Sequence, residues 1–185
     1  MNHGHKPHIN WLNPWRLALW SVALGLLLLP LIAMQFTEEV NWTAFDFVVA
    51  AILLGTTALL IDLGCCYSVN LSGRAGWMVM VLTSFLLIWI NLAVGIIGSE
   101  NNPANLLYVV VLLSAVLGGL VVRFKPRAMS KVLLLTAMLQ IAVELVIRLS
   151  GWGAAPVINI TFALLWLLAA GLLYNSHTTN RVTEA

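Results

Sequence analysis

Long apolar runs separated by short polar turns make up most of the chain. Six of these runs are long enough to cross a membrane as an α-helix, which takes about 20 residues for a hydrocarbon core of about 30 Å. A helix satisfies its own backbone hydrogen bonds, which lipid cannot do. We therefore predict an all-α, polytopic transmembrane helical bundle with six spans. The predicted spans are 17–36, 45–63, 75–97, 104–122, 128–149 and 157–174.

These spans divide the chain into a short tail, a membrane domain and a second tail. We expect a cytoplasmic N-terminal tail at 1–16, a six-helix transmembrane domain at 17–174 and a cytoplasmic C-terminal tail at 175–185. The first span follows Lys6 and Arg16, as the apolar region of a signal peptide would. It is longer than the usual 7 to 15 apolar residues, and no convincing small-x-small cleavage site follows it. We expect this helix to be retained.

A weak internal repeat relates alternate spans at an offset of 53 residues. The most distinctive matches are Arg74, Gly98 and Pro103 with Arg127, Gly151 and Pro156. One interpretation is three helical hairpins of the same orientation. The alternative is that leucine-rich helices align by chance.

Composition agrees with the membrane assignment and excludes several other classes. Only 9% of the residues are charged and 61% are hydrophobic, whereas a soluble domain carries about 25% charged residues. The scarcity of charge also argues against a disordered chain and a nucleic-acid-binding module, so we expect no nucleic-acid partner. Two cysteines cannot form the framework of a disulfide-rich secreted domain.

The positions of Lys and Arg predict the orientation, because cytoplasmic loops retain basic residues. With six spans and the N-terminus inside, eight of the nine basic residues fall on the inner face and only Arg148 lies toward the outside. We predict a multi-pass protein of the bacterial inner membrane with both termini in the cytoplasm. The inner basic residues are Lys6, Arg16, Arg74, Arg123, Lys125, Arg127, Lys131 and Arg181.

A polar stripe runs along the fifth span. Thr136, Gln140, Glu144 and Arg148 recur at steps of four, so they share one side of the helix. Ionisable residues at membrane depth are costly, which makes them functional candidates. The stripe is either the wall of a polar pathway or a structural feature, in which Thr136 and Gln140 bond to neighbouring helices while Glu144 pairs with Arg148.

Carboxylates and carboxamides also gather at the outer ends of the spans. We call the following candidate residues the outer cluster: Asp46, Asn91, Glu100, Asn105, Glu144, Arg148 and Asn159. Oxygen ligands of this kind suit a hard cation, a protonated amine or a proton-coupled site. Helix capping and turn formation are the alternative roles for such residues. The pattern identifies no particular metal, and it predicts no cofactor.

A basic turn joins the fourth and fifth predicted spans. It carries Arg123, Lys125, Arg127 and Lys131 within nine positions. These residues are candidates for binding anionic lipid headgroups, since each charge contributes about 1 kcal/mol near an anionic membrane surface. Setting the orientation of the spans is a sufficient alternative role.

Three sequence segments resemble elements of small uncharacterised bacterial inner-membrane proteins. They are FTEEVNWTAFDF at 36–47, WINLAVGIIGSENNPAN at 89–105 and RFKPRAMSKVLL at 123–134. The resemblance covers about two thirds of the chain. It implies a membrane location but no activity, cofactor or partner.

Three functions remain open at this point. The preferred hypothesis is a small-molecule or ion binding or transport-type protein with a polar site at its outer, periplasmic end. The second is an accessory or scaffolding subunit of a membrane complex. For the chain in general, either a second copy or another membrane protein is a candidate partner. The third is a membrane enzyme acting on a lipid-soluble substrate. We consider it the weakest, because the chain contains no nucleophile-elbow, zinc-protease, phosphate-loop or dinucleotide motif.

Overall fold

The structure is a computed structural model that describes residues 13–68 and 70–183, with side chains described as far as Ser176. Its described part is helical and contains no strand. The helices are α1 (Pro14–Ala33), α2 (Ala44–Tyr67), α3 (Leu71–Ala93), a 3-10 helix η1 (Pro103–Leu106), α4 (Leu107–Val121), α5 (Pro126–Leu149) and α6 (Pro156–Thr183).

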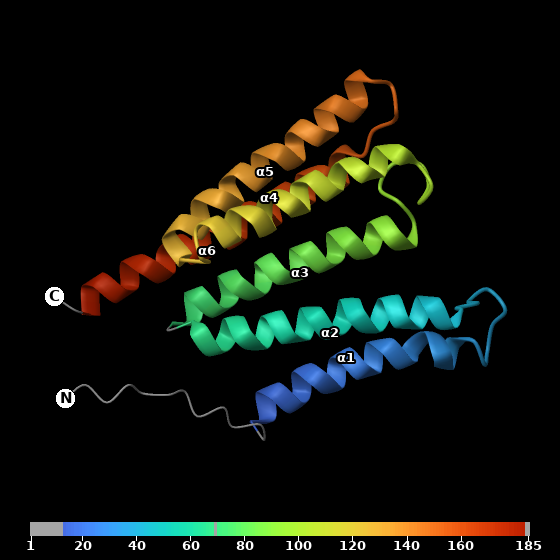
Figure 1. Cartoon of the computed structure of the whole chain (residues 1–185), viewed down its shortest axis with the longest axis horizontal. Coiled ribbons are helices and arrows are strands. Elements are labelled where there is room, and N and C mark those ends of the chain that lie inside the picture. The colour runs from blue at the N-terminus through green and yellow to red at the C-terminus, as the bar shows by residue number, and fades with distance from the viewer. Residues whose placement is uncertain (1–12, 69, 184–185) are drawn as a thin grey trace. The chain divides into compact units, whose positions relative to one another are not determined.

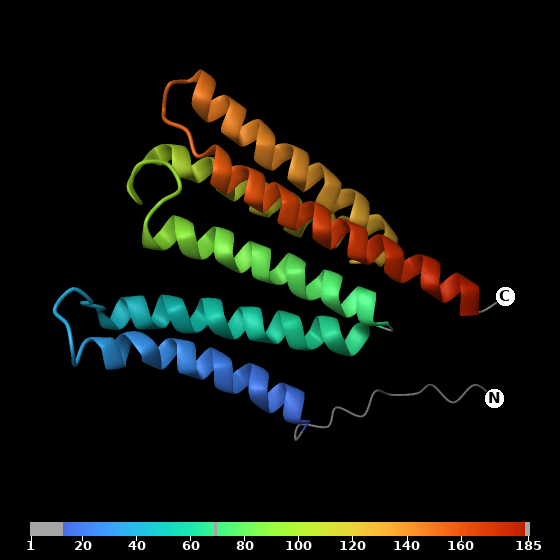
Figure 2. The ribbon, with the colours of Figure 1, turned by 180° about the vertical axis from the view of Figure 1, so that it is seen from behind.

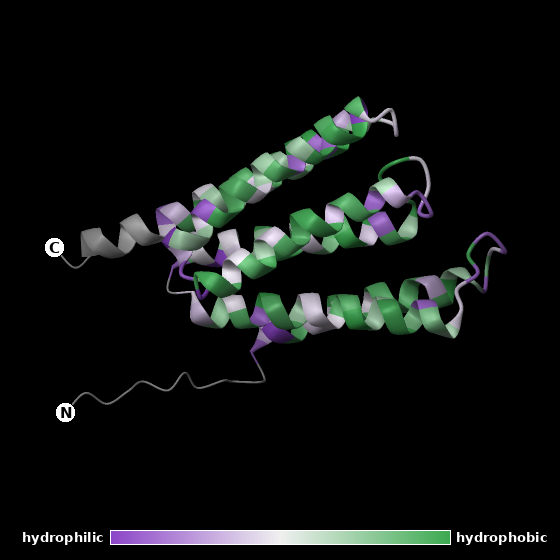
Figure 3. Ribbon diagram, turned by 45° about the horizontal axis from the view of Figure 1, so that its top comes forward, coloured by the Kyte–Doolittle hydropathy of each residue, from purple (hydrophilic) through white to green (hydrophobic). Residues whose placement is uncertain are grey.

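The predicted all-α fold with six spans is confirmed. Six helical segments are long and apolar enough to cross a membrane, η1 and α4 counting as one. Figure 3 shows that the helices are mostly hydrophobic and that hydrophilic residues concentrate at turns and helix ends. The chain is therefore a multi-pass integral membrane protein, and its exposed apolar side chains contact the lipid bilayer.

The third span ends four residues before its predicted boundary. We predicted a helix to residue 97, but α3 ends at Ala93. Gly95 follows with φ +72°, in the left-handed region that a helix cannot use. The Oδ1 atom of Asn105 then accepts the backbone N–H groups of Ile96 (3.0 Å) and Ile97 (2.9 Å), which takes both residues out of the helix.

The two ends of the chain also differ from the prediction. α1 begins at Pro14 instead of residue 17, because Asn13 caps it by accepting the backbone N–H of Trp15 at 3.2 Å. α6 continues to Thr183, although we placed its end at 174 and a tail from 175 onward. Buried Ser176 shows that this extension is in contact with the rest of its unit, since its backbone carbonyl accepts the Asn70 Nδ2 donor at 2.7 Å.

The helices divide into two compact units, residues 1–67 and 68–185. In the first unit α1 packs on α2. An ion pair joins them, in which the Arg16 Nε donates to Asp62 Oδ2 at 2.9 Å and a terminal guanidinium nitrogen donates to the same oxygen. Both side chains are nearly buried, so this is an internal ion pair.

In the second unit α6 lies beside both α5 and α3, and α4 lies beside α5 (Figures 1 and 2). The core between these helices includes fully buried Leu87, Leu133, Ile147 and Trp166. The turn after α3 and the turn after α5 lie at the same end of the unit and are in contact, because a Cβ at Gly153 would be 3.1 Å from Ile97 Cγ2.

The turns after α3 and α5 share two features at the positions that the repeat aligns. Gly98 and Gly151 both have φ +70°, and Pro103 and Pro156 both begin helices. The main neighbour of α3, however, is α6, and α3 and α4 are not a closely packed pair. The turns thus agree at the matched Gly and Pro positions, while the three-hairpin repeat stays a prediction.

Close packing of α3 against α6 depends on Gly76. A Cβ at this position would lie 2.9 Å from Leu173 Cγ and 3.0 Å from the Leu173 backbone nitrogen. We expect Gly76→Val to lower the free energy of unfolding by about 2 kcal/mol, because the helices must separate to accept the side chain. Denaturation with SDS in mixed micelles measures this loss. Gly171→Ala, on α6 with open space around it, is the matched control and should not destabilise the protein.

Candidate functional site

Asn159 is the centre of a hydrogen-bond network that joins α4, α5 and α6. It lies in the first turn of α6, three residues after Pro156, and is fully buried. The two hydrogens of its Nδ2 are shared among three acceptors within hydrogen-bond distance, which are Glu144 Oε2 (2.7 Å), the Tyr108 hydroxyl (2.9 Å) and the carbonyl of Ala155 (3.1 Å). Its Oδ1 accepts from Gln140 Nε2 at 2.7 Å. We call Asn159, Glu144, Gln140 and Tyr108 the Asn159 network.

Glu144 is the charged member of this network. Its Oε2 accepts from Asn159 and from the backbone N–H of Ala155 at 3.1 Å. Its Oε1 accepts from an Arg148 terminal nitrogen at 3.1 Å. The Glu144 side chain is only 11% exposed, whereas that of Arg148 is 55% exposed. The carboxylate is therefore inside the helix bundle and its counterion is at the edge.

The Asn159 carboxamide has its orientation fixed by its neighbours. Gln140 can donate only to the oxygen of Asn159, and Glu144 can accept only from its nitrogen. The reversed orientation would place the amide oxygen against the carboxylate. The result is a polar site with one negative charge, surrounded by neutral groups that have defined directions.

One acceptor in the site remains unused. Gln140 is fully buried, and its Oε1 has no hydrogen-bond donor among the described residues. The Tyr108 hydroxyl, also buried, is held in the same network through Asn159. A buried polar atom without a partner costs free energy, about 1–3 kcal/mol, so a site that retains one is a candidate for binding.

The polar stripe of α5 divides into two parts. Gln140 and Glu144 enter the Asn159 network, and exposed Arg148 closes it at the outer end. Thr136 lies one turn deeper, where its hydroxyl bonds to the Val132 carbonyl (3.0 Å) and to the Ser114 hydroxyl of α4 (3.0 Å). Thr136 thus contributes to helix packing, which was one of the two roles we had left open for it.

The other predicted residues of unit 68–185 do not enter the network. Asn105 bonds to the loop backbone, with its Nδ2 donating to the carbonyl of Ser99 at 2.7 Å. Glu100 is exposed and accepts from Asn101 Nδ2 at 3.1 Å. Asn91 donates to the Leu87 carbonyl of its own helix at 2.9 Å, and its Oδ1 is buried without a donor. These contacts are turn and helix contacts.

Asp46 belongs to the other unit and acts at the start of α2. Its Oδ2 accepts the backbone N–H of Thr43 at 2.7 Å and the Thr43 hydroxyl at 2.8 Å. This is the local bonding of a helix start, which was the alternative role for the outer carboxylates.

The sequence did not identify Tyr108 as a member of the Asn159 network, nor Arg16 as the partner of Asp62. Tyr108 was not a candidate because a single tyrosine in an apolar run gives no polar periodicity. The partner of Asp62 was also missed, although the approximate depths of Arg16 and Asp62 at the inner ends of adjacent spans could have indicated it.

The chain matches no family model, no curated protein and no solved structure. Its own side chains are therefore the guide to its function. Within the described ranges, no three His, Cys, Asp or Glu side chains lie close enough to hold a metal ion. The Asn159 network has a single carboxylate, so its charge suits one positive charge or a hydrogen-bond donor more than a divalent ion.

Proposed function

We propose that this membrane protein is a small-molecule or ion binding or transport-type protein, and that the Asn159 network is its site. The observation that carries the proposal is the buried Glu144 carboxylate beside the unused Oε1 of Gln140. A buried charge and an unsatisfied acceptor each cost free energy. A ligand that donates hydrogen bonds would bond to both groups.

The ligand class follows from the oxygen atoms of the site. Glu144, Gln140 and Tyr108 supply acceptors, and the only formal charge among them is negative. A protonated primary amine carries one positive charge and three N–H donors, which matches this set. Both Glu144 oxygens are already engaged in the structure, so such a ligand would enter by displacing Arg148, whose side chain is half exposed.

The orientation of the site is also a proposal. Most basic residues lie at the inner ends of the spans, which supports cytoplasmic termini in a bacterial inner membrane and a site at the periplasmic end.

The test compares two ammonium ions that differ in their hydrogen-bond donors. Ethylammonium has three N–H groups and tetramethylammonium has none. We expect ethylammonium chloride to raise the Tm of the purified protein in micelles above the value in equal tetramethylammonium chloride. Glu144→Gln should abolish the difference. Arg148→Gln should tighten the binding of ethylammonium about fivefold. The substitution removes the exposed Arg148 side chain, whose ion pair with Glu144 competes with the ligand and is worth about 1 kcal/mol.

Glu100→Gln is the matched control. Glu100 is an exposed acid at the same end of the unit, bonded only to Asn101, so the response to ethylammonium should survive its loss. Equal responses to the two ammonium ions, or loss of the response in Glu100→Gln, would contradict the proposed site.

A further inference from the structure

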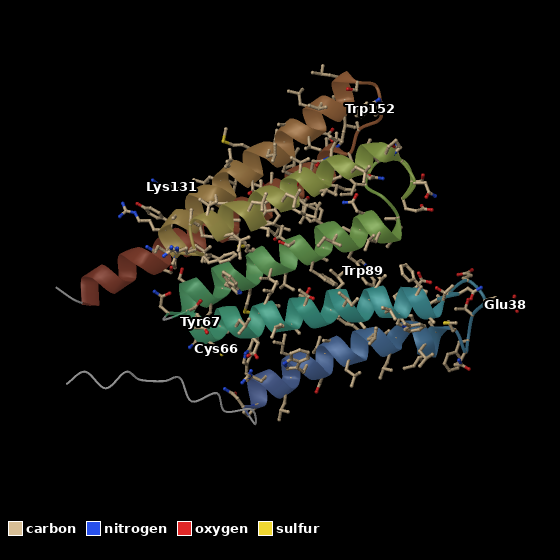
Figure 4. The ribbon with its side chains drawn as sticks, in the orientation of Figure 1. Glu38, Cys66, Tyr67, Trp89, Lys131 and Trp152 are labelled. Atoms are coloured by element: carbon tan, nitrogen blue, oxygen red, sulfur yellow. The ribbon has the colours of Figure 1, made fainter. Side chains whose placement is uncertain are left out.

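The basic turn between α4 and α5 forms a surface that the proposed function does not use. An open hollow of about 510 Å³ lies there, lined by Lys125, Pro126, Arg127, Ala128 and Lys131. Three of its five lining residues are basic and exposed. Figure 4 shows Lys131 at the opposite end of α5 from Trp152, which marks the end that holds the Asn159 network.

Among the described residues of unit 68–185, no acidic side chain lies at this end of the helices. In the described part of unit 68–185 the acidic residues are Glu100 and Glu144. Both lie at the other end of the helices, Glu144 being about 20 Å from Lys131 along α5 at 1.5 Å per residue. The charges of the hollow are thus available to an anion.

The turn has a defined shape. Arg123 and Phe124 both have φ 52°, in the left-handed region that costs a non-glycine residue about 1 kcal/mol or more. The Phe124 ring holds both residues there. It packs edge-on against Trp77, with the two ring centroids 5.6 Å apart. It also lies on Gly119, where an added Cβ would be 2.4 Å from Phe124 Cε1. The basic residues that follow therefore start from a fixed position.

An apolar strip continues from the hollow along α5. Leu134, Leu135 and Met138 follow Lys131 at steps of three, four and seven, so they share its face of the helix. Leu135 is 61% exposed and Met138 is 70% exposed. Acyl chains would cover this strip, and a free phosphate ion would not.

We propose that the hollow binds the headgroup phosphate of an anionic phospholipid, with the acyl chains along the Leu134, Leu135 and Met138 strip. The turn joins two spans and so lies at headgroup depth in the bilayer. The long side chain of Lys131 reaches from the apolar strip back to the phosphate. Charge, depth and the adjoining apolar strip all match a phospholipid.

The experiment titrates purified protein in phosphatidylcholine micelles with phosphatidylglycerol and records the Tm. Phosphatidylglycerol should raise the Tm above that in phosphatidylcholine alone. The triple variant Lys125→Gln, Arg127→Gln, Lys131→Gln should lose most of this rise. Lys131→Gln alone should weaken binding about fivefold, the factor expected for one charge near an anionic headgroup.

Arg74→Gln is the matched control, because Arg74 is an exposed basic residue at the start of α3 and does not line the hollow. The Arg74→Gln variant should show the full rise in Tm with phosphatidylglycerol. An unchanged rise in the triple variant, or the same rise with inorganic phosphate in place of phosphatidylglycerol, would overturn the proposal. If the triple variant fails to fold, the comparison of Lys131→Gln with Arg74→Gln decides, and equal loss in both would overturn it.

Discussion

Replacing Asn159 with leucine is expected to lower the free energy of unfolding by about 3 kcal/mol. The leucine keeps the volume, but three bonds between helices are lost, to Gln140, Glu144 and Tyr108. Bonds of this kind are worth about 0.6 to 2 kcal/mol each in membrane proteins. The groups left behind are buried and include a carboxylate, which adds to the loss. Denaturation by SDS in mixed micelles, followed by circular dichroism, measures the change.

Asn91→Leu is the matched control. Asn91 is also an asparagine within a span, but its side-chain Nδ2 donates to the Leu87 carbonyl of its own helix, at 2.9 Å. Its Oδ1 is buried and has no donor in the described part of the chain, so removing the side chain relieves an unsatisfied group. We expect a change within about 1 kcal/mol. Equal losses in the two variants would show that the Asn159 network does not hold the helices together.

Breaking the Arg16–Asp62 pair from one side is expected to cost about 3–5 kcal/mol. Asp62→Leu leaves the Arg16 guanidinium nearly buried without its carboxylate. Removing both charges, in Arg16→Met with Asp62→Leu, should restore stability to within about 1 kcal/mol of the natural protein. The reason is that the desolvation cost of a buried pair roughly offsets its attraction. A double-mutant cycle with the same denaturation measures both values.

Arg74→Met serves as the control for loss of a basic residue near the inner end of a span. Arg74 is exposed and its Nε donates to the Ser68 carbonyl at 3.4 Å, a long bond. Little stability should be lost. A double variant as unstable as Asp62→Leu would mean that Arg16 stabilises the protein through contacts other than Asp62.

The six spans could be predicted from sequence because each depends on local hydropathy over about 20 residues. The end of α3 could not, because it depends on a contact across nine residues, between Asn105 and the Ile96 N–H group. The extension of α6 to Thr183 was missed for a related reason. Polar residues such as Ser176 end an apolar run, yet the helix continues past Ser176, whose backbone carbonyl accepts a hydrogen bond from Asn70 Nδ2.

The candidate site was predicted in part. The four-residue spacing identified Gln140 and Glu144, and helix-start position identified Asn159. Hydropathy and spacing indicate how deep a residue lies in the membrane, but they do not show which neighbouring helix each side of a helix faces. That is why Asn91, Glu100 and Asn105 were grouped with Glu144, although their bonds are local. Tyr108 could be assigned to the Asn159 network only from the structure, in which its hydroxyl on α4 bonds to Asn159 on α6.

The Arg16–Asp62 pair also bears on how the first two helices are made. Its partners are 46 residues apart in the chain. At a synthesis rate of about 5–20 residues per second, Asp62 follows Arg16 by a few seconds. During that interval the Arg16 guanidinium cannot yet bond to Asp62, and basic residues beside a nascent span are the ones on which the positive-inside rule acts. Once Asp62 arrives, the same guanidinium becomes half of an internal ion pair. The contact that fastens α1 to α2 can therefore form only after most of the second helix has been synthesised.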